Sequence, residues 1–268
     1  QFGKECVELG SDLAEVQNVV DVTFTTMSDK VNEFAKNAMT TAGLSETMAK
    51  RYVGTFGAMS KSFGFSESQA YDMSTALTQL TGDVASFYNI SQDLAYIKLK
   101  SVFTGETETL KDLGVVLTQS ALDQYALANG YGKTTSEMTE QEKVALRLAF
   151  VQKQLSAASG DFIRTSGSWA NQVRVMQLQI QSLKATIGQG LINIFTPVIK
   201  VINTLLAKLA TVANAFKSFT ELITGNKSSG QTGASGAGLT GTDLSATEGA
   251  YSNAADGADS LADATQNV

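Results

Sequence analysis

Side chains that could perform chemistry are few in this sequence and widely spaced. It contains no histidine, which removes the usual general base near neutral pH and the commonest metal ligand. It contains one cysteine, Cys6, so a disulfide framework and a cysteine-based zinc site are excluded. We interpret Cys6 as a small buried apolar side chain. Catalysis by a His-dependent triad is therefore ruled out from the composition alone.

Carboxylates are the remaining candidates for general acid–base chemistry. Four that could be considered as members of an acid pair are Asp72, Asp83, Glu106 and Glu108. No paired spacing or apolar setting marks any of them as a group whose pKa a protein would tune for catalysis. We interpret them as solvated helix faces and caps. The sequence predicts no catalytic residue, no cofactor-binding residue and no metal ligand.

Anion binding has equally little support. Residues 54–57 (Gly-Thr-Phe-Gly) and 130–134 (Gly-Tyr-Gly-Lys-Thr) contain glycine, but neither has the spacing of a phosphate-binding loop or follows a strand. We assign them to turns and close helix packing, and Arg164 to the solvated surface. The net charge is −6 and no basic patch stands out, so specific nucleic-acid binding is not predicted.

The elements that must position these residues are predicted to be helices, giving an all-α fold. A single proline, Pro197, suits long helices, because proline removes a backbone donor. Residues 43–47, 64–68 and 89–93 each place glycine or asparagine before an apolar residue and a serine. The first residue can end one helix in the left-handed conformation, and the serine can cap the next. Residues 1–165 are therefore predicted to form multiple short helical hairpins.

Two further local patterns lie in this first region. Thr139 and Glu142 form a capping-box pattern before a helix expected over about 140–158, with Gly160 as its stop. Four residues share the apolar face of that helix: Val144, Leu148, Val151 and Leu155. Residues 113–117 (Leu-Gly-Val-Val-Leu) are the one run that could be a strand, and a helix turn explains them equally well.

Residues 166–224 are predicted to form a long, kinked amphipathic helix that begins near Ser168. A bend is expected at residues 188–190 (Gly-Gln-Gly), and Pro197 is expected to kink the helix or start a new one. Apolar residues recur at gaps of four and three, the spacing of a helix that buries one stripe against other helices. We interpret Trp169 as a core residue. We call the stripe the seam: Trp169, Val173, Met176, Ile180, Leu183, Ile187, Leu191, Phe195, Val198, Ile202, Leu205, Leu209, Val212, Phe216, Phe219 and Ile223.

The middle of this helix also has the character of a membrane segment. Residues 185–199 are uncharged, and extension to Ala207 reaches the length of a spanning helix. The longer segment includes Gln189, Asn193, Pro197, Lys200 and Asn203, which favours a soluble core helix. Conditional insertion, with these residues buried between several copies, stays open as the alternative.

The two ends of the chain indicate a piece of a longer protein. Gln1 already lies in a helical pattern, and no signal peptide is visible. Residues 225–268 hold eight glycines, five acidic residues and one lysine, with few large apolar side chains. That composition predicts a disordered tail or flexible linker.

Several strings in the sequence resemble tape measure proteins of long-tailed bacteriophages and prophages of Gram-positive bacteria. The longest is residues 159–172, Ser-Gly-Asp-Phe-Ile-Arg-Thr-Ser-Gly-Ser-Trp-Ala-Asn-Gln. Residues 183–193 (Leu-Lys-Ala-Thr-Ile-Gly-Gln-Gly-Leu-Ile-Asn) and 196–199 (Thr-Pro-Val-Ile) follow it. The resemblance spans roughly residues 10–210, and its upstream strings are residues 35–38, 43–47, 61–64, 82–89 and 103–111.

The resemblance implies a structural role rather than an enzymatic one. Proteins of this family are largely helical, lie in several copies inside the tail tube, and set tail length during assembly. They leave the tail at infection and are linked to DNA passage through the host envelope. The implied partners are other copies of the chain, tail tube and tail assembly proteins, and the host membrane. The implied locations are the virion tail, the host cytoplasm during assembly, and the host membrane at infection.

Two other functions are weighed against this one. The first is a membrane-active helical protein, a pore former or translocator that inserts residues 185–207. The second is a cell-wall-degrading enzyme, which the lack of a catalytic pattern disfavours. Because short helices predominate before residue 166, we expect a compact region of the ruler protein rather than its extended rod. The sequence leaves open whether the seam pairs within one chain or between chains.

Overall fold

The computed structural model describes residues 2–106 and 108–224, and side chains as far as Ser218. Every regular element in these ranges is a helix, so the predicted all-α fold is confirmed. The chain divides into two units, Gln1–Gly190 and Leu191–Val268, and the division falls inside the last helix.

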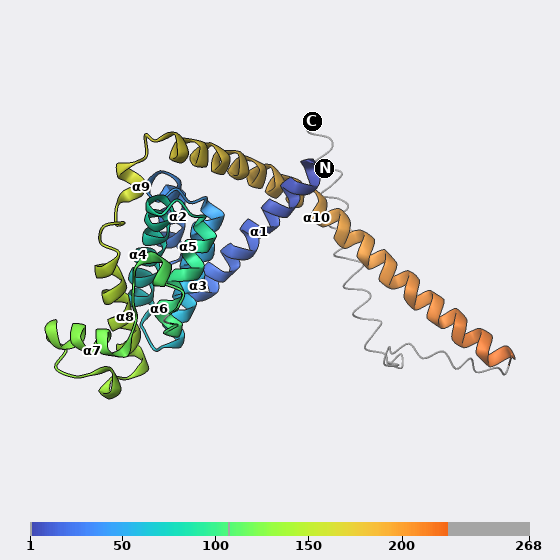
Figure 1. Cartoon of the computed structure of the whole chain (residues 1–268). Coiled ribbons are helices and arrows are strands. Elements are labelled where there is room, and N and C mark those ends of the chain that lie inside the picture. The colour runs from blue at the N-terminus through green and yellow to red at the C-terminus, as the bar shows by residue number, and fades with distance from the viewer. Residues whose placement is uncertain (1, 107, 225–268) are drawn as a thin grey trace. The chain divides into compact units, whose positions relative to one another are not determined.

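Unit 1 contains the short helices and the first turns of the last one (Figure 1). We refer to its helices before Trp169 as the helical body. The elements, with η marking short 3₁₀ helices, are α1 Phe2–Thr23, α2 Ser28–Thr41, α3 Glu46–Ser62, α4 Glu67–Phe87, α5 Gln92–Leu99, α6 Ser101–Thr104, η1 Lys111–Leu113, α7 Gln119–Ala128, η2 Thr135–Glu137, α8 Glu140–Gln154, α9 Asp161–Arg164 and α10 Trp169–Thr224.

The three predicted joints have the expected conformation. Gly43, Gly64 and Asn89 have φ of +63°, +88° and +51°, in the left-handed region. The serine that follows each joint accepts a backbone N–H of the next helix: Ser45 from Met48, Ser66 from Gln69 and Ser91 from Leu94. These local signals end α2, α3 and α4 and start α3, α4 and α5, as predicted.

The core of unit 1 lies between α3 and α4, with α1, α2 and α5 packed against this pair (Figure 1). Its aromatic centre joins Tyr52, stacked on Tyr96 at 4.3 Å between ring centroids, to Phe56, which lies 5.9 Å from Phe103. Helices α6, α7 and α8 extend this core. Arg147 of α8 donates hydrogen bonds to the carbonyl oxygens of Val102 and Phe103, at 2.6 and 2.9 Å, and so fixes α8 to α6.

Two predictions for the middle of the chain need correction. The run at residues 113–117 is not a strand: Leu113 ends the 3₁₀ helix η1, Gly114 caps it in the left-handed conformation, and residues 115–117 follow without regular secondary structure, with Val115 and Leu117 buried. The predicted helix to residue 158 ends at Gln154, and Leu155 is its cap. Gly160, at φ +74°, begins α9 rather than stopping α8, because its left-handed conformation redirects the chain after the turn at residues 155–160.

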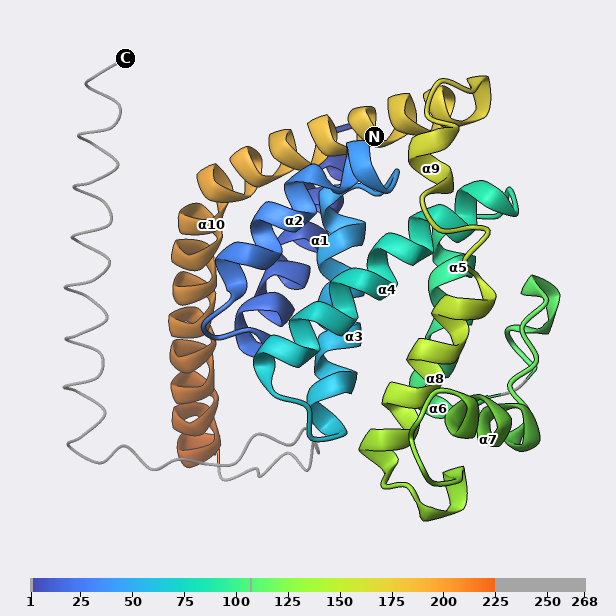
Figure 2. The ribbon, with the colours of Figure 1, turned by 90° about the vertical axis from the view of Figure 1, so that its left-hand side faces the viewer.

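The last helix begins at Trp169, close to the predicted start, and no new helix begins at Pro197. Both views show its first turns, in yellow, running from α9 toward the N-terminal end of α1 (Figure 1 and Figure 2). The segment of α10 from Leu191 belongs to unit 2. The side chains of Phe219 and Ile223, and the predicted tail at 225–268, lie outside the described part of the chain.

Candidate functional site

The first turns of α10 contact the helical body through a face that carries one large apolar residue, Leu178, among small and polar ones. Asn171, Leu178, Ala185 and Gly188 are buried there. At about 100° per residue, these positions point roughly opposite to the seam residues of the same turns. The helix therefore turns its more apolar side away from the body.

A buried polar network holds the start of α10. The side-chain amide of Asn171 donates to Thr165 Oγ1 at 2.8 Å and to Ser86 Oγ at 3.1 Å. Ser86 Oγ in turn donates to Asp161 Oδ2 at 2.7 Å. Because Ser86 lies on α4 and Asp161 on α9, the network ties three helices together. Buried polar groups joined in this way hold a single geometry, since an unpaired one would be costly.

Asp83 supports the same junction from α4. Its carboxylate accepts the backbone N–H groups of Gly160 and Phe162, at 2.8 and 3.2 Å, and so caps the start of α9. Burial raises the pKa of Asp83, against the effect of these two hydrogen bonds. The interpretation of Asp83 as a solvated carboxylate is therefore wrong, although it does act as a cap. The other three candidate carboxylates, Asp72, Glu106 and Glu108, are exposed.

Farther along, α10 crosses α1 with almost no space between the two backbones. A Cβ on Gly188 would overlap the carbonyl oxygen of Cys6, and a Cβ on Gly10 would lie 2.6 Å from the backbone nitrogen of Gln189. Glycine is thus required at both positions for close approach, which the sequence did not reveal. Lys184 Nζ adds an ion pair to Glu5 Oε1 at 2.6 Å. Cys6 is fully buried beneath this crossing, as predicted.

The seam lies uncovered along α10, on its first turns as well as beyond Gly190. Trp169 is 84 % exposed, so its interpretation as a core residue is wrong. Val173 and Leu191 are partly exposed, and every other seam residue as far as Phe216 is exposed. The predicted burial of this stripe does not occur within the described chain. The prediction of a soluble core helix over 185–199 fails for the same reason, since only Ala185 and Gly188 are buried there.

The charge of α10 has one sign over its described side chains. Residues 169–218 include five cations and no acidic residue; the cations are Arg174, Lys184, Lys200, Lys208 and Lys217. An 18-residue window of the helix reaches a mean hydropathy of 1.6, and none of that window is buried. By length and composition alone, this helix could cross a membrane.

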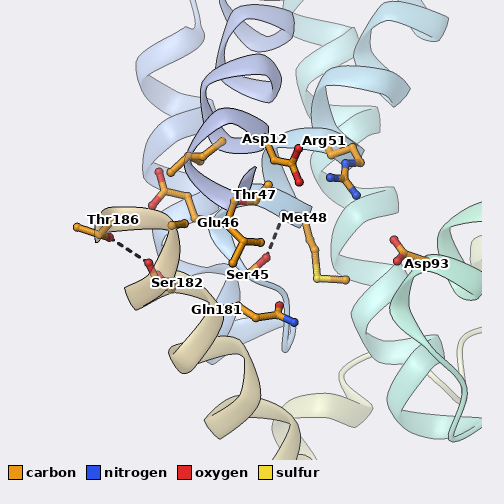
Figure 3. A pocket seen from close by; sticks show the side chains of 13 residues that line it. Asp12, Ser45, Glu46, Thr47, Met48, Arg51, Asp93, Gln181, Ser182 and Thr186 are labelled. Atoms are coloured by element: carbon orange, nitrogen blue, oxygen red, sulfur yellow. Dashed lines mark hydrogen bonds between the residues drawn. The ribbon is translucent and has the colours of Figure 1, made fainter. Parts of the chain in front are cut away.

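A hollow of about 280 Å³ lies between α1, α3 and the first part of α10, all within unit 1 (Figure 3). Its charged lining residues are Asp12, Glu46, Arg51 and Asp93. Asp93 accepts a hydrogen bond from the hydroxyl of Tyr52 at 2.6 Å, and burial is the main cause that raises the pKa of Tyr52. No nucleophile and base are paired in this hollow. Within residues 2–106 and 108–224, no three Asp, Glu or Cys side chains gather as a metal site.

The remaining sequence candidates have structural roles. Gly57 packs against the ring of Phe24, which leaves no room for a Cβ, and Gly130 and Gly132 occupy left-handed turn positions. Both findings confirm the assignment of these motifs to packing and turns. Arg164 is half-exposed, and it donates to the carbonyl oxygens of Ser159 and Ala157, so it fixes the turn before α9.

No family model matches this chain, and no curated protein or solved structure is significantly similar to it. The geometry therefore carries the functional argument. The geometry leaves the seam as the candidate functional site. It adds the residues that hold α10 against the helical body. Sequence reasoning missed Ser86, Asp161 and Asn171 as members of that support. The last two lie inside the string at residues 159–172, and their place in that string was the one signal in the sequence that singled them out.

Proposed function

We propose that this chain is a compact region of a phage tail tape measure protein, a structural component that sets tail length and helps DNA pass the host envelope. The observation that carries the proposal is the uncovered seam: large apolar side chains at helical spacing follow α10 from Trp169 to Phe216. The strings that resemble the family lie on both sides of the junction that holds this helix.

An uncovered stripe of this length needs a partner. Apolar surface left in water costs roughly 25 cal/mol per Å², and soluble monomers rarely expose extended apolar patches. The periodicity of the stripe fits other helices better than it fits a small molecule. In an assembling tail, the partners are other copies of the chain together with tail tube and tail assembly proteins. The protein acts in the host cytoplasm during assembly and inside the tail tube afterwards.

A change in helix length tests this function. Residues 191–218 comprise four heptads, so their in-frame deletion or duplication keeps the register of the seam. At 1.5 Å per residue, 28 residues correspond to about 42 Å of α-helix. We expect mean tail length, measured by electron microscopy of virions carrying the altered gene, to fall or rise by about that amount. Asn203→Gln leaves the number of residues unchanged and is the control. Tails of unaltered length in both variants would contradict the proposal.

A second function, membrane activity of α10, is favoured by its uncovered apolar window and its cations. Dye release from vesicles that contain anionic lipid tests it on the full chain. Ile199→Glu places a charge in the uncharged stretch and should abolish release, because a charge near the bilayer centre is costly. A chain that neither binds nor permeabilises the vesicles excludes this second function. Lysis of peptidoglycan in a zymogram would contradict the non-enzymatic role of both proposals.

A further inference from the structure

A second hollow, of about 290 Å³, lies in unit 1 beside the one that Arg51 lines. Its walls come from the first turns of α10, from the joint and first residue of α5, and from Met48 of α3. Among the residues that line it, Arg174 alone carries a charge. We infer that this hollow, here called the Arg174 hollow, binds the carboxylate group of an acidic peptide. The inference is independent of the seam and of the proposed function.

Arg174 reaches only neutral groups of its own chain. Its guanidinium donates hydrogen bonds to Asn171 Oδ1 and to the carbonyl oxygen of Ile90, both at 3.4 Å, which is longer than the usual range. No acidic residue of the described chain forms an ion pair with it. Burial lowers the pKa of Arg174, and no nearby carboxylate acts against this effect. A partly buried cation without a counter-charge is costly, and a bound anion would offset that cost.

The other three arginines of the sequence have acidic neighbours. Arg164 forms an ion pair with Asp161 at 3.4 Å. Glu140 lies close enough to Arg147 to raise its pKa against the effect of burial. Arg51 shares its hollow with three acidic residues. These three cations are compensated within the chain, so Arg174 is the arginine that is left for an external anion.

The polar groups around Arg174 suit a carboxylate. Asn89, Gln92, Gln177 and Gln181 contribute side-chain amides to the lining. Gln92 is engaged with a backbone carbonyl oxygen, whereas the other three amides make no hydrogen bond within the described residues. A guanidinium can hold both oxygens of a carboxylate in one plane, and an amide N–H can donate to either oxygen. The hollow therefore offers one charge and several unengaged donors to a single planar anion.

The rest of the lining favours a peptide over an inorganic anion. Met48, Val173 and Leu178 place apolar side chains in the same hollow, where they can contact the methylene groups that carry a carboxylate. One cation balances one carboxylate, whereas a phosphate group carries roughly −1.5 to −2 at pH 7 and calls for more than one. Asn89, Gln177 and Gln181 are exposed, so the hollow is open to a side chain that arrives from solvent.

Titration of the full chain with N-acetylglutamate α-amide, a single carboxylate on a peptide-like stem, tests the inference. At constant ionic strength, we expect a saturable NMR shift of the Arg174 Nε–H signal and of the backbone amides of Gln92 and Gln177. Arg174→Gln should raise the dissociation constant, measured on those backbone amides, at least about tenfold. The matched control is Arg51→Gln, which removes a cation from the neighbouring hollow and should leave the constant within about twofold.

A second variant blocks the hollow without removing its cation. Gln177→Glu puts a carboxylate three residues along α10 from Arg174, a spacing at which helical ion pairs form. Gln177 is exposed, so the variant should keep its helix content by circular dichroism. We expect the new carboxylate to occupy Arg174 and to weaken binding at least about tenfold. Gln179→Glu adds the same charge at an exposed position outside the hollow and should change binding by less than about twofold.

Two further probes separate the sources of the anion. Tighter binding of N-acetylglutamate α-amide than of N-acetylglycine supports recognition of an acidic side chain, and the reverse order supports recognition of a chain terminus. Inorganic phosphate that binds more tightly than both carboxylates overturns the inference. Absence of a saturable shift at Arg174, shifts of equal size at Arg51, or binding that survives both Arg174→Gln and Gln177→Glu overturns it as well, because each outcome would show only a general attraction of anions to the chain.

Discussion

Helices α3 and α4 differ from α10 in what covers their apolar residues. All three carry large apolar side chains at helical spacing. On α3 and α4 those residues are enclosed: Phe56 and Leu77 are fully buried. On α10 no seam residue with a described side chain is buried, and Leu205 is 61 % exposed.

This difference shows what periodicity does and does not determine. A stripe with a spacing of three and four residues predicts a helix and a face that requires a partner. It does not say which chain supplies the partner. In unit 1, α10 meets the body through Asn171, Leu178, Ala185 and Gly188. Gly188 permits the close approach of the two backbones, Asn171 joins a polar network, and Leu178 is the one large apolar side chain on that face. The apolar face is then left for another molecule.

The largest expected effect contrasts two leucines. Leu77→Ala opens a cavity in the α3–α4 core and should lower the free energy of unfolding by about 2–5 kcal/mol. Leu205→Ala removes a side chain that is already in water and should change it by less than about 0.5 kcal/mol. Urea denaturation at a concentration where the chain is monomeric measures both.

Protein concentration sharpens that contrast. If the seam of unit 2 is covered only on association, Leu205→Ala becomes destabilising when the chain is concentrated, and Leu77→Ala keeps the same effect. A large loss for Leu205→Ala in the dilute monomer would show that the comparison is wrong and that this part of the seam is buried within one chain.

The next effect concerns two neighbouring glycines of α10. Gly188→Ala forces a Cβ against the Cys6 carbonyl and should cost about 1–3 kcal/mol, the range of overpacked sites. At Gly190 no atom lies within 4 Å of the added Cβ, so Gly190→Ala should stabilise the helix by up to about 1 kcal/mol. Thermal unfolding distinguishes the two signs. Equal effects would mean that both glycines serve the predicted bend and that the close crossing has no energetic role.

The joints of the helical body were predictable because their signals are local. Left-handed Gly43 and Gly64 and the caps at Ser45 and Ser66 each depend on residues within a few positions. The all-helical fold followed from the same signals. Gly160 was misassigned because the identical conformation can end one helix or begin another, and only the following turn decides between them.

The supports of α10 could not be predicted, because they join distant parts of the sequence. Asn171 and Ser86 are 85 residues apart. Gly10 and Gly188 meet only once both helices are placed, and neither residue differs in sequence from a glycine in an open position such as Gly190. Trp169 was misassigned for a related reason: its face could be judged only after the opposite face was known to contact the body.

A moderate effect is expected where the polar network anchors α10. Asn171→Ala removes the three hydrogen bonds that the side-chain amide donates, to Ser86 and to two atoms of Thr165, and the long one that Asn171 Oδ1 accepts from Arg174 at 3.4 Å. The change should lower the free energy of unfolding by about 1–3 kcal/mol. Gln179→Ala is the control, since Gln179 is exposed on the same helix and its truncation should cost less than about 0.5 kcal/mol. Hydrogen exchange should locate the Asn171→Ala loss at α9 and the first turns of α10. A loss spread evenly over the helical body would mean that the network is not a separate anchor.

The smallest effect is a difference in acid response between α8 and α10. Two hydrogen bonds lower the pKa of Glu142 from its ordinary value near 4.5 to about 2. The one from Lys133 has the larger effect, and the one from the backbone N–H of Thr139 adds to it. A lowered pKa stabilises the fold above the ordinary value, and this contribution is lost as the pH falls from 4.5 toward 2. Residues 191–218 contain no carboxylate that titrates in this window.

Hydrogen exchange at a series of pH values, corrected for intrinsic rates, separates the two helices. Protection at the first turn of α8 should fall through this window, while protection in residues 191–218 should not depend on the carboxylate. Glu142→Gln keeps an acceptor for the Thr139 N–H but removes the charge that Lys133 pairs with, so its α8 profile should be flatter. An unchanged pH dependence in Glu142→Gln would place the acid-sensitive contacts of unit 1 elsewhere. In that case the ionised Glu142 carboxylate would not be what makes the protection of α8 depend on pH, and α8 and residues 191–218 would not differ through this charge.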